Sequence, residues 1–408
     1  MDIVIISEFT ESFARDDNDR FLYLARMLAE EHEVELVTGS FRHSTKSRRT
    51  EPADPWPFRI TFLEEPGYPR NICLQRFRSH REWGRNVLDY LKSRKKPDAV
   101  WCAVPSLTGP RLVGKYCEKN RIRFIIDVQD LWPEAFRMAL NIPGLSKAIF
   151  APFACLANGI YRRADAVCAV SESYRARALR VNRKTTEGCA VYLGVELEAF
   201  DRCAAAHPLS GKPYRRKEGE ILLGYAGTLG TSYDLPVVFE AMRKLGRPEV
   251  RMIVVGDGPL AESFRQKAEG LKVTFTGRLP WEEMCGVLKG CDMVVNPIIG
   301  TSVATIINKH GDYAACGRPV LNTQASDEYR TLVEEYRMGF NCRPGDAAEL
   351  AEKIEKLMND PALREEMGRN ARRCAEEKFD RAATYPRFFA VLRAAEDSAQ
   401  RSECRVES

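Results

Sequence analysis

The sequence predicts an α/β protein of two Rossmann-like domains, each a parallel sheet with helices on its faces. The chain has 408 residues, more than one ordinary hydrophobic core accommodates. Short β-rich runs alternate with amphipathic helical stretches, and this alternation is typical of parallel sheets joined by right-handed crossovers. A polar segment with little periodicity, residues 198–219, separates two such series.

The first series predicts a domain over residues 1–200. A helix over 15–31 is expected to begin in the Asp/Asn-rich stretch 16–19, because such side chains cap helix N-termini. The expected strands are Asp2–Ile6, Glu33–Thr38, Ala99–Cys102, Phe124–Asp127, Ala166–Val170 and Val191–Leu193.

The second series predicts a domain over residues 220–378, after a linker at 201–219. Its expected strands are Glu220–Ala226, Val250–Val255, Val273–Thr276, Met293–Asn296 and Pro319–Leu321. Its expected helices are Leu235–Leu245, Leu260–Glu269, Trp281–Leu288, Asn308–Ala315, Asp327–Glu335 and Ala347–Met358. A further helix is expected over 379–393, and the polar tail 394–408 is expected to be frayed.

Composition excludes several classes of protein. No basic and apolar leader precedes the first strand, and no stretch approaches the roughly 20 apolar residues of a membrane span. The nearest, Ala148–Ala157, suits a buried helix or an interfacial patch. The chain has 13 cysteines, no CxxC pair and 5 histidines. We therefore expect free thiols in a reducing cytoplasm and no metal site.

The charge is concentrated in one segment. Residues 41–100 hold fourteen Lys and Arg against seven acidic residues, about +7, while the whole chain carries +5. Such a segment attracts anionic lipid headgroups or phosphates, although it can also be a solvated basic face. We do not expect nucleic acid as a partner, because no ladder of stacking aromatic residues accompanies the charge.

Three glycine turns follow successive strands of the second domain. Together they supply Gly227, Thr228 and Gly230, then Gly256 and Gly258, and finally Gly277 with Arg278. Glycine lets backbone amides approach an anion, and the helix that follows favours negative charge. One such turn is often only a tight turn, but three in one domain favour nucleotide or phosphate binding. The GxGxxG fingerprint of dinucleotide sites is absent.

A fourth cluster lies on the predicted helix from Asn308 to Ala315. Asp312 falls within one turn of Asn308 and Lys309, so these side chains can share a face. An acid of this kind can hold ribose hydroxyls while the lysine neutralises phosphate. A surface ion pair is the alternative.

These motifs resemble family 4 glycosyltransferases, which are retaining enzymes of the GT-B fold. The resemblance rests on 224–230, 254–259, 275–279, Cys291-Asp292, Asn296-Pro297 and 308–320, in matching order and spacing. In the first half, 126–134 (Ile-Asp-Val-Gln-Asp-Leu-Trp-Pro-Glu) resembles a segment of members that build bacterial surface polysaccharides, and 169–172 and 192–195 also match.

The resemblance implies a nucleotide-sugar donor, usually a UDP-sugar, in the second domain. The base would lie near Gly277 and Arg278, Asp312 would hold the ribose, and the diphosphate would rest on the Gly227–Gly230 turn with Lys309 as its charge partner. Family members need no metal, and their terminal helix, here 379–393, returns to the first domain.

Two positions depart from the family pattern. The first glutamate of the E-x7-E motif is replaced by Ala304, and Asp312 stands for the second. The Arg-x4-Lys pair that often follows the first glycine turn is replaced by 231–234, Thr-Ser-Tyr-Asp. Both changes bear on the donor sugar, so the sequence does not identify it.

The acceptor would lie on the first domain, where two residues are candidates. His80 lies in the basic segment and can contact an acceptor phosphate or assist proton transfer, although a single histidine is more often structural. Asp130 follows a strand end, where cleft residues lie, but it also suits a helix N-cap near Pro133.

The expected function is transfer of a sugar, with retention, from a nucleotide-sugar donor to a lipid-linked or polysaccharide-precursor acceptor. The basic segment and Ala148–Ala157 would place the enzyme on the cytoplasmic face of an anionic membrane. The alternatives are a catalytically silent nucleotide-sugar-binding subunit and a nucleotide-sugar epimerase.

Overall fold

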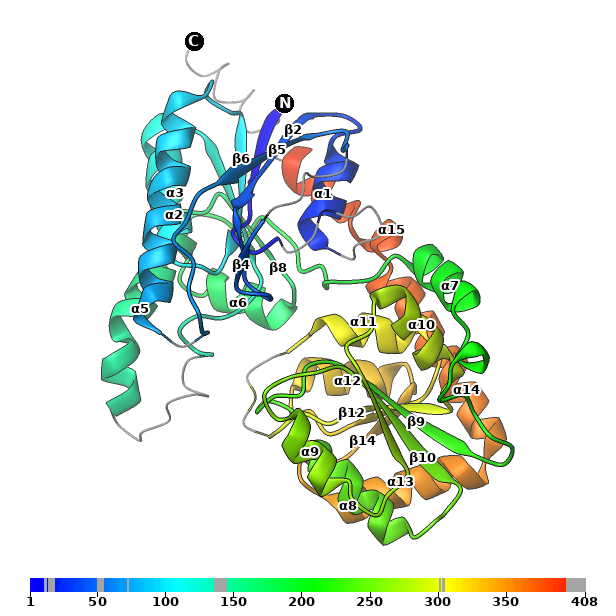
Figure 1. Cartoon of the computed structure of the whole chain (residues 1–408). Coiled ribbons are helices and arrows are strands. Elements are labelled where there is room, and N and C mark those ends of the chain that lie inside the picture. Colours follow the sequence, from blue (N-terminus) through cyan, green and yellow to red (C-terminus); the bar gives the residue numbers. More distant parts are fainter. Residues whose placement is uncertain are drawn as a thin grey trace. The chain divides into compact units, whose positions relative to one another are not determined.

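The computed structural model describes residues 1–10, 13, 19–49, 55–71, 73–135, 145–300, 302 and 305–393. The chain divides into two compact units, one of residues 1–192 with 385–408 and the other of residues 193–384. Each unit is a parallel α/β sheet with helices on its faces, so the predicted fold class is confirmed (Figure 1).

The first unit contains a six-stranded parallel sheet in the order β5-β2-β1-β6-β7-β8. Its strands are β1 (Asp2–Ile6), β2 (Glu33–Gly39), β5 (Arg59–Leu63), β6 (Ala99–Val104), β7 (Arg123–Val128) and β8 (Ala166–Ala169), and a separate antiparallel pair is formed by β3 (Phe41–Arg42) and β4 (Ser47–Arg48). Its helices are α1 (Arg20–Leu28), α2 (Leu74–Ser93), α3 (Thr108–Asn120), α5 (Leu145–Tyr161) and α6 (Glu172–Leu179).

The alternation of side chains along the strands divides the core of this unit between two faces. Ile3 and Ile5 of β1 pack with α1 and with the C-terminal residues Tyr385 and Phe388. Helices α2, α3 and α5 lie on the other side of the sheet (Figure 1). Helix α1 is capped by Asp19, whose side chain accepts from the backbone N–H groups of Phe21 and Leu22, as the Asp/Asn-rich stretch predicts.

One expectation for this unit was wrong, and one strand was missed. Residues 191–193 form no strand, because Arg20 donates its Nη1 hydrogen bonds to the carbonyls of Val191 and Tyr192, which leaves those carbonyls no neighbouring strand to pair with. Strand β5 was not predicted, because its alternating residues lie at the sheet edge and are largely accessible.

The second unit contains a six-stranded parallel sheet in the order β11-β10-β9-β12-β13-β14. Its strands are β9 (Ile221–Ala226), β10 (Val250–Val255), β11 (Val273–Gly277), β12 (Met293–Asn296), β13 (Val320–Asn322) and β14 (Gly339–Asn341). Its helices are α7 (Leu197–Ala206), the 3-10 turn η1 (Leu209–Gly211), α8 (Leu235–Leu245), α9 (Ala261–Lys267), α10 (Trp281–Gly290), α11 (Asn308–Ala315), α12 (Asp327–Glu335), α13 (Ala347–Asn359), α14 (Pro361–Cys374), the π-helical turn η2 (Ala375–Phe379) and α15 (Arg381–Thr384).

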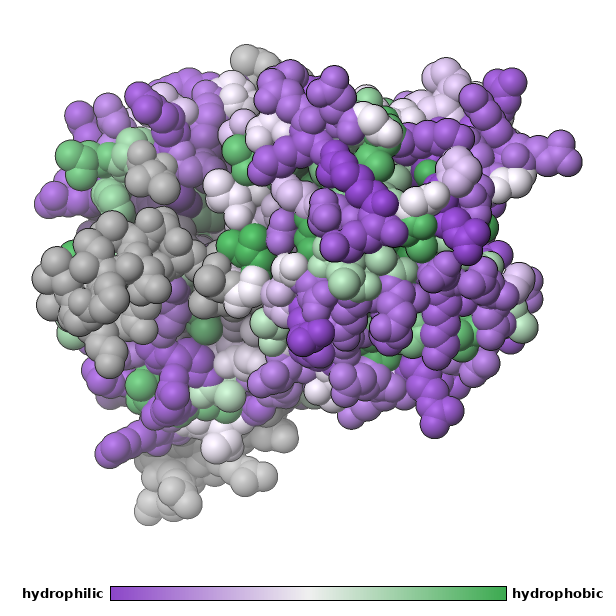
Figure 2. Space-filling model, turned by 90° about the horizontal axis from the view of Figure 1, so that it is seen from below, coloured by the Kyte–Doolittle hydropathy of each residue, from purple (hydrophilic) through white to green (hydrophobic). Residues whose placement is uncertain are grey.

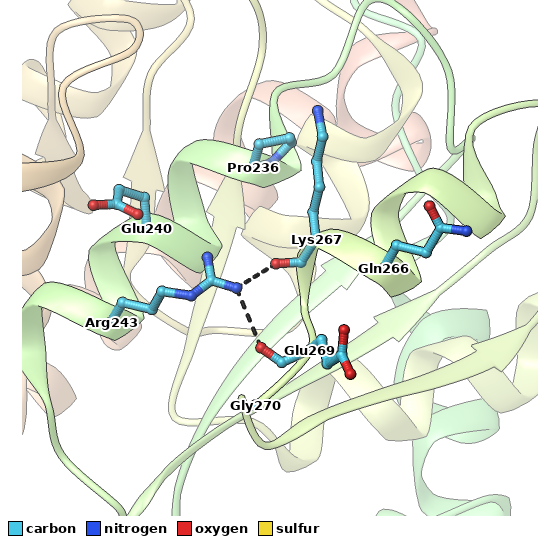
Figure 3. A pocket seen from close by; sticks show the side chains of 7 residues that line it. All are labelled: Pro236, Glu240, Arg243, Gln266, Lys267, Glu269 and Gly270. Carbon is cyan, nitrogen blue, oxygen red and sulfur yellow. Dashed lines mark hydrogen bonds between the residues drawn. The ribbon is translucent and has the colours of Figure 1, made fainter.

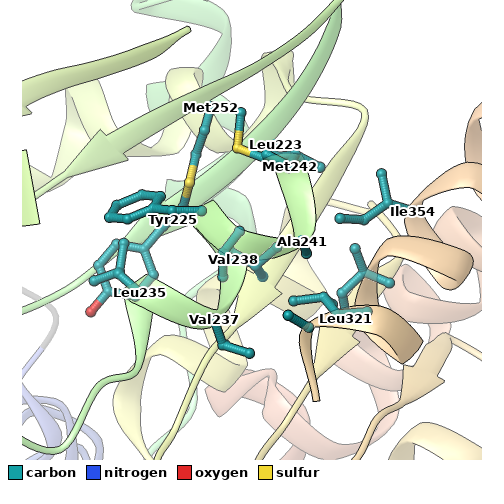
Figure 4. Close-up of a cluster of buried hydrophobic side chains, with 14 of the residues drawn as sticks. Leu223, Tyr225, Leu235, Val237, Val238, Ala241, Met242, Met252, Leu321 and Ile354 are labelled. Carbon is teal, nitrogen blue, oxygen red and sulfur yellow. The ribbon is translucent and has the colours of Figure 1, made fainter. Parts of the chain in front are cut away.

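The main core of this unit lies between the sheet and helices α8, α9 and α13. Leu223 and Met252 of the strands meet Val238 and Met242 of α8 and Ile354 of α13 (Figure 4). All five side chains are at most 5% exposed, so this core is closed to solvent.

The expected linker was partly wrong. Residues 197–206 form α7, an amphipathic helix whose Leu197, Phe200 and Ala204 recur at helical spacing and are buried. The expected terminal helix 379–393 is broken at its start, where η2 ends at Phe379 and α15 covers only Arg381–Thr384. Residues 387–393 are helical, and Val391 and Leu392 enter the core of the first unit.

The surface is mixed. The face in Figure 2 carries hydrophobic residues in separate patches among hydrophilic ones. None of the helices in the described ranges has the length and hydrophobicity that crossing a membrane requires.

Candidate functional site

The strand order of the second sheet has a switch point between β9 and β12. From β9 the chain continues to β10 and β11 on one side, and it returns to β12 and β13 on the other. The turns after the two strands are joined, since the Asp234 N–H donates to Pro297 O over 2.8 Å and Tyr233 pairs with Ile298. Ligands of open α/β sheets bind outside the carboxyl ends of the strands at such a point.

The turn after β9 offers backbone donors at this position. Gly227 has a φ of +149°, and the Tyr225 hydroxyl group holds the turn by donating to Thr228 O over 2.9 Å. Within the described part of the chain, the N–H groups of Thr228 and Gly230 donate to no other group. A turn with free amides next to a helix is suited to an anion.

The glycines of the second turn have a packing role. A Cβ at Gly256 would lie 1.9 Å from Gly227 O, and one at Gly258 would lie 2.5 Å from Leu229 O. The two turns are therefore packed backbone to backbone, and Leu229 N donates to Asp257 O over 2.9 Å. Gly256 and Gly258 support the first turn in this structure.

The third turn is open. Nothing lies within 4 Å of a Cβ built on Gly277, which has a φ of +74°. Arg278 and Asn308 are exposed, as is Thr228 of the first turn.

Lys309 lies beside the first turn, in a cage of tyrosine rings. Its Nζ is 3.9 Å from the ring centroid of Tyr233 and 4.2 Å from that of Tyr225, and Tyr313 lies farther away at 6.0 Å. A Cβ on Gly227 would lie 2.6 Å from this Nζ, so the absence of a side chain there makes room for the amine. Lys309 is 7% exposed, and among the described residues its Nζ has no hydrogen-bond partner.

Burial holds the pKa of Lys309 well below its usual range, and the nearby Asp312 carboxyl group opposes this only in part. The side chain therefore favours the neutral amine. Tyrosine faces stabilise a cation, but they provide no hydrogen-bond acceptor of the strength of an oxyanion.

Asp312 lies one turn further along α11 and is also buried. Its Oδ1 accepts from the Trp281 indole Nε1 over 3.0 Å. Burial raises the pKa of Asp312 to about 6, against the Trp281 hydrogen bond and the charges of Arg381 and Lys309. Trp281 was not among the predicted site residues; its signal in the sequence was its place four residues after Gly277.

Helix α11 is fixed to both strands at the switch point. The Ala226 N–H at the end of β9 donates to the Tyr313 hydroxyl group over 3.0 Å. His310 lies 3.2 Å from Asn296 Nδ2 at the end of β12, and its Nδ1 accepts from Ile307 N over 3.3 Å. Its ring also stacks on Tyr329 at 3.5 Å. These contacts determine where Lys309 and Asp312 lie, while Ala304 falls outside the described residues.

The predicted acceptor residues meet around Trp132 in the first unit. The rings of His80 and Trp132 stack at 5.8 Å, and the Trp132 Nε1 donates to Asp130 Oδ2 over 3.3 Å. Burial lowers the pKa of His80 to about 3, so its ring is neutral, and burial raises the pKa of Asp130. Asp130 also accepts from Leu131 N, in the manner of a local cap.

A hollow of about 690 Å³ lies between α8 and α9 (Figure 3). Arg243 closes one side of it by donating to the carbonyls of Lys267 and Glu269. None of the glycine turns, Lys309 or Asp312 lines it. The described residues also contain no group of three or more His, Cys, Asp or Glu arranged to hold a metal ion.

Both halves of the chain match families of known proteins. Residues 18–194 match the family described as Glycosyl transferase 4-like domain, and residues 220–360 match Glycosyl transferases group 1. The sulfoquinovosyl transferase SQD2 of Arabidopsis thaliana is 28% identical over 194 residues, 47% of this chain and 37% of that protein. The capsular polysaccharide biosynthesis glycosyltransferase CapM of Staphylococcus aureus is 44% identical over 61 residues, 15% of this chain and 16% of that protein.

The chain thus spans well under half the length of these two curated relatives. Among solved structures, HepE of Anabaena in complex with UDP has a TM-score of 0.66 at 14% identity and covers 99% of this chain and 100% of its own. That likeness extends to the whole chain and concerns the fold. Two regions of the chain are thus similar to glycosyltransferase families, and the whole chain shares the GT-B fold.

Proposed function

We propose that the protein is a nucleotide-sugar-dependent glycosyltransferase of the hexosyltransferase type, and that its second unit binds the donor. The observation that carries this proposal is the buried, unpartnered amine of Lys309 beside the Gly227 turn. It lies at a switch point, where open sheets of this kind bind ligands.

The donor's diphosphate would bind the free amides of Thr228 and Gly230 and the amine of Lys309, which would take up a proton as the anion binds. The four-carbon side chain of Lys309 is long enough to carry its amine from the tyrosine cage to the open side of the turn. A diphosphate supplies the acceptor oxygens that this amine lacks, and charge-assisted hydrogen bonds are about twice as strong as neutral ones. The same groups stabilise the charge that grows on the leaving diphosphate during transfer.

The donor's ribose would be held by Asp312. Trp281 donates to one carboxylate oxygen and fixes its orientation, which leaves the other oxygen for a hydroxyl group. The base would lie beside the open turn at Gly277 and Arg278. UDP is our proposed nucleotide, because HepE, which shares this fold, has been crystallised with UDP and with UDP-glucose.

The reaction would proceed with retention and without a metal. Positive charge develops at the anomeric carbon and negative charge on the leaving phosphate, so the site has to stabilise charge separation. Lys309 and the backbone amides meet this need on the phosphate side. Turnover that is unchanged by EDTA is therefore expected.

The acceptor would be a lipid-linked or polysaccharide-precursor saccharide bound by the first unit at the cytoplasmic face of the membrane. Three large apolar residues are exposed on α2 and α5: Leu74 at 85%, Phe77 at 45% and Ile149 at 40%. Leu74 and Phe77 belong to the basic segment, and the ring of Phe77 lies 5.6 Å from that of Phe153 on α5. Each Lys or Arg near an anionic surface contributes about 1 kcal/mol to membrane binding.

Calorimetry with UDP, GDP and their sugar conjugates tests the donor site, and product analysis with lipid-linked saccharides tests turnover. Binding of a nucleoside diphosphate that falls at least tenfold in Lys309→Met supports the site. Nucleotide binding without transfer or donor hydrolysis would instead favour a silent binding subunit. The matched control is Lys289→Met, which replaces a lysine on α10 whose side chain is 44% exposed and pairs with Asp201.

Flotation with anionic vesicles at rising salt tests the membrane proposal separately. Binding at low salt that is lost in a Leu74→Ser/Phe77→Ser double variant supports it. If wild-type protein stays with the soluble fraction at every salt concentration, the membrane proposal is wrong while the donor proposal stands.

A further inference from the structure

Arg76 stands apart from the other arginines of the basic segment. Four of them are ion-paired: Arg48 with Glu64, Arg59 with Glu35, Arg78 with Glu82, and Arg94 with Asp2 and Glu35. Arg70, Arg81 and Arg85 are exposed to solvent. Within the described ranges, Arg76 has no carboxylate at ion-pair distance, although it is half-buried on α2.

The guanidinium group of Arg76 is held by aromatic rings. Its central carbon lies 4.9 Å from the ring centroid of Trp132, 5.5 Å from that of Tyr68 and 6.0 Å from that of Phe9. Cation–π contacts stabilise the charge without neutralising it. The side chain therefore keeps a full positive charge in a fixed place.

Two hydrogen bonds further restrict Arg76. Its Nη1 donates to Asn71 O over 2.9 Å, and its Nε donates to His80 Nε2 over 3.4 Å. His80 is neutral, since burial lowers its pKa to about 3, so it accepts this bond without repelling the guanidinium group. Within the described chain, Nη2 donates to no group and remains available.

Two acidic side chains, Glu8 and Asp130, interact with the charge of Arg76, which opposes the rise of their pKa values but forms no ion pair with either in the described structure. Burial raises the pKa of Glu8 well above its usual value and raises that of Asp130, so both carboxyl groups hold a proton more readily. Glu8 Oε2 accepts from the Ser106 hydroxyl group. Its other oxygen, Oε1, has no hydrogen-bond partner among the described residues and lies 3.8 Å from His80 Nε2.

The cluster also lies at the edge where open α/β sheets bind ligands. The first sheet has its switch point between β1 and β6, since the chain runs from β1 to β2 on one side and from β6 to β7 on the other. Glu8 follows β1 and Ser106 follows β6, so their hydrogen bond spans the switch point at the carboxyl ends of both strands.

We propose that Arg76 is the anion-binding residue of the first unit and binds a phosphate or diphosphate group of the acceptor. A preorganised guanidinium fork matches the geometry of two phosphate oxygens. The surrounding basic segment favours an anion of more than one charge. This inference rests on the proposed function, because it assigns the phosphate to the acceptor rather than to the donor.

Binding of inorganic pyrophosphate, farnesyl diphosphate and farnesol, measured by calorimetry, tests the inference. The titrations are made in a Lys309→Met background with UDP present, so that the second unit contributes little to the signal. The variants are Arg76→Gln and Arg76→Lys. Arg78→Gln is the control on the same helix, since that arginine is exposed and paired with Glu82.

We expect Arg76→Gln to weaken pyrophosphate and farnesyl diphosphate binding at least tenfold, and Arg78→Gln to change it less than twofold. Arg76→Lys should be intermediate, because lysine keeps the charge but not the fork. Farnesyl diphosphate binding more tightly than pyrophosphate would assign the phosphate to a lipid, and equal affinities would assign it to a soluble acceptor.

The proposal is overturned if neither diphosphate binds, if Arg76→Gln leaves both affinities unchanged, or if farnesol binds as tightly as farnesyl diphosphate. UDP affinity, measured with Lys309 intact, should be the same with and without Arg76→Gln. If UDP does not bind even to the wild-type protein, the donor proposal fails while the pyrophosphate result still decides the role of Arg76.

Discussion

Replacing Lys309 by methionine is expected to stabilise the unliganded protein and to weaken nucleotide binding at the same time. Lys309 is 7% exposed, and its amine has no hydrogen-bond partner in the described structure. An unsatisfied buried donor costs about 1–3 kcal/mol. Methionine is unbranched, of similar length and adaptable in packing, so it can occupy the space between Tyr225 and Tyr233 without that cost.

The tyrosine rings offset part of this cost in the wild-type protein. A desolvated cation–π contact contributes about 2 kcal/mol, but only to the charged form. Burial lowers the pKa of Lys309 and so favours the neutral amine, which does not receive this contribution. We therefore expect the free energy of unfolding to rise by about 1–3 kcal/mol in Lys309→Met, which is about 2–4 °C in Tm for each kcal/mol.

In contrast, Lys309→Met should reduce the stability that bound UDP adds to the protein. UDP at 100 times its Kd adds about 2.7 kcal/mol to the stability of the wild-type protein. A tenfold loss of affinity reduces that gain to about 1.4 kcal/mol at the same UDP concentration. Urea denaturation at pH 8, with and without UDP, measures both quantities. Lys289→Met, which removes only a partly exposed ion pair with Asp201, should stay within about 0.5 kcal/mol in each.

Two results would refute this reasoning. A Lys309→Met protein that is clearly less stable than wild type would show that the amine makes favourable contacts in the free state. An undiminished gain from UDP would show that the diphosphate does not use Lys309.

Three further predictions concern the pH dependence caused by Lys309, the ribose contact of Asp312 and the ion pair of Arg20 with Asp127. Because the pKa of Lys309 is lowered in the folded state, the unfolded chain binds more protons between that lowered pKa and about 10.4, so stability rises with pH in this range by up to about 1.4 kcal/mol per unit. Lys309→Met should remove this contribution, which urea denaturation measured at a series of pH values up to about 10 would show. Asp312→Asn should lower the affinity for UDP at least tenfold and that for pyrophosphate less than twofold, because only UDP carries a ribose; equal losses in calorimetry would contradict the ribose contact. Arg20→Met should destabilise the first unit by about 3–5 kcal/mol, because it leaves the buried Asp127 carboxylate without its ion-pair partner. Adding Asp127→Leu to this variant should restore part of the lost stability in denaturation curves. If no stability is recovered, the ion-pair explanation is wrong.

The sequence was sufficient for the parallel sheets and for most of the helices. Alternation of short apolar runs with amphipathic stretches is a local signal, and the central strands β1, β6, β9 and β10 are apolar almost throughout. The failures came where a distant contact decides. Arg20 donates hydrogen bonds to the carbonyls of Val191 and Tyr192. No sequence pattern around residue 191 predicts this contact, because the arginine lies about 170 positions earlier.

The site was predictable in its parts but not in its arrangement. Glycines after strands mark the turns, yet the sequence does not tell a turn that is open from one that supports another. Only the structure shows that Gly256 packs against Gly227 O and supports the first turn, while the turn at Gly277 is open. Arg76 and Glu8 were missed for the same reason, because their meaning depends on which carboxyl groups lie near them in space.

The replacement of the Arg-x4-Lys pair is explained by where α11 places Lys309. In the expected arrangement, the cations follow the first glycine turn along the chain. Here Tyr233 stands in that stretch, and its ring covers an amine that comes from a helix about 80 residues later. Because Tyr313 and His310 fasten that helix to both strands of the switch point, the position of Lys309 is as well defined as that of a residue on the turn itself. An amine held in this way has already lost its water, so an ion pair formed when it takes up a proton beside a diphosphate would be little weakened by solvent. We infer that loss of the pair after Gly230 changes which element carries the charge and leaves the electrostatic function of the turn intact.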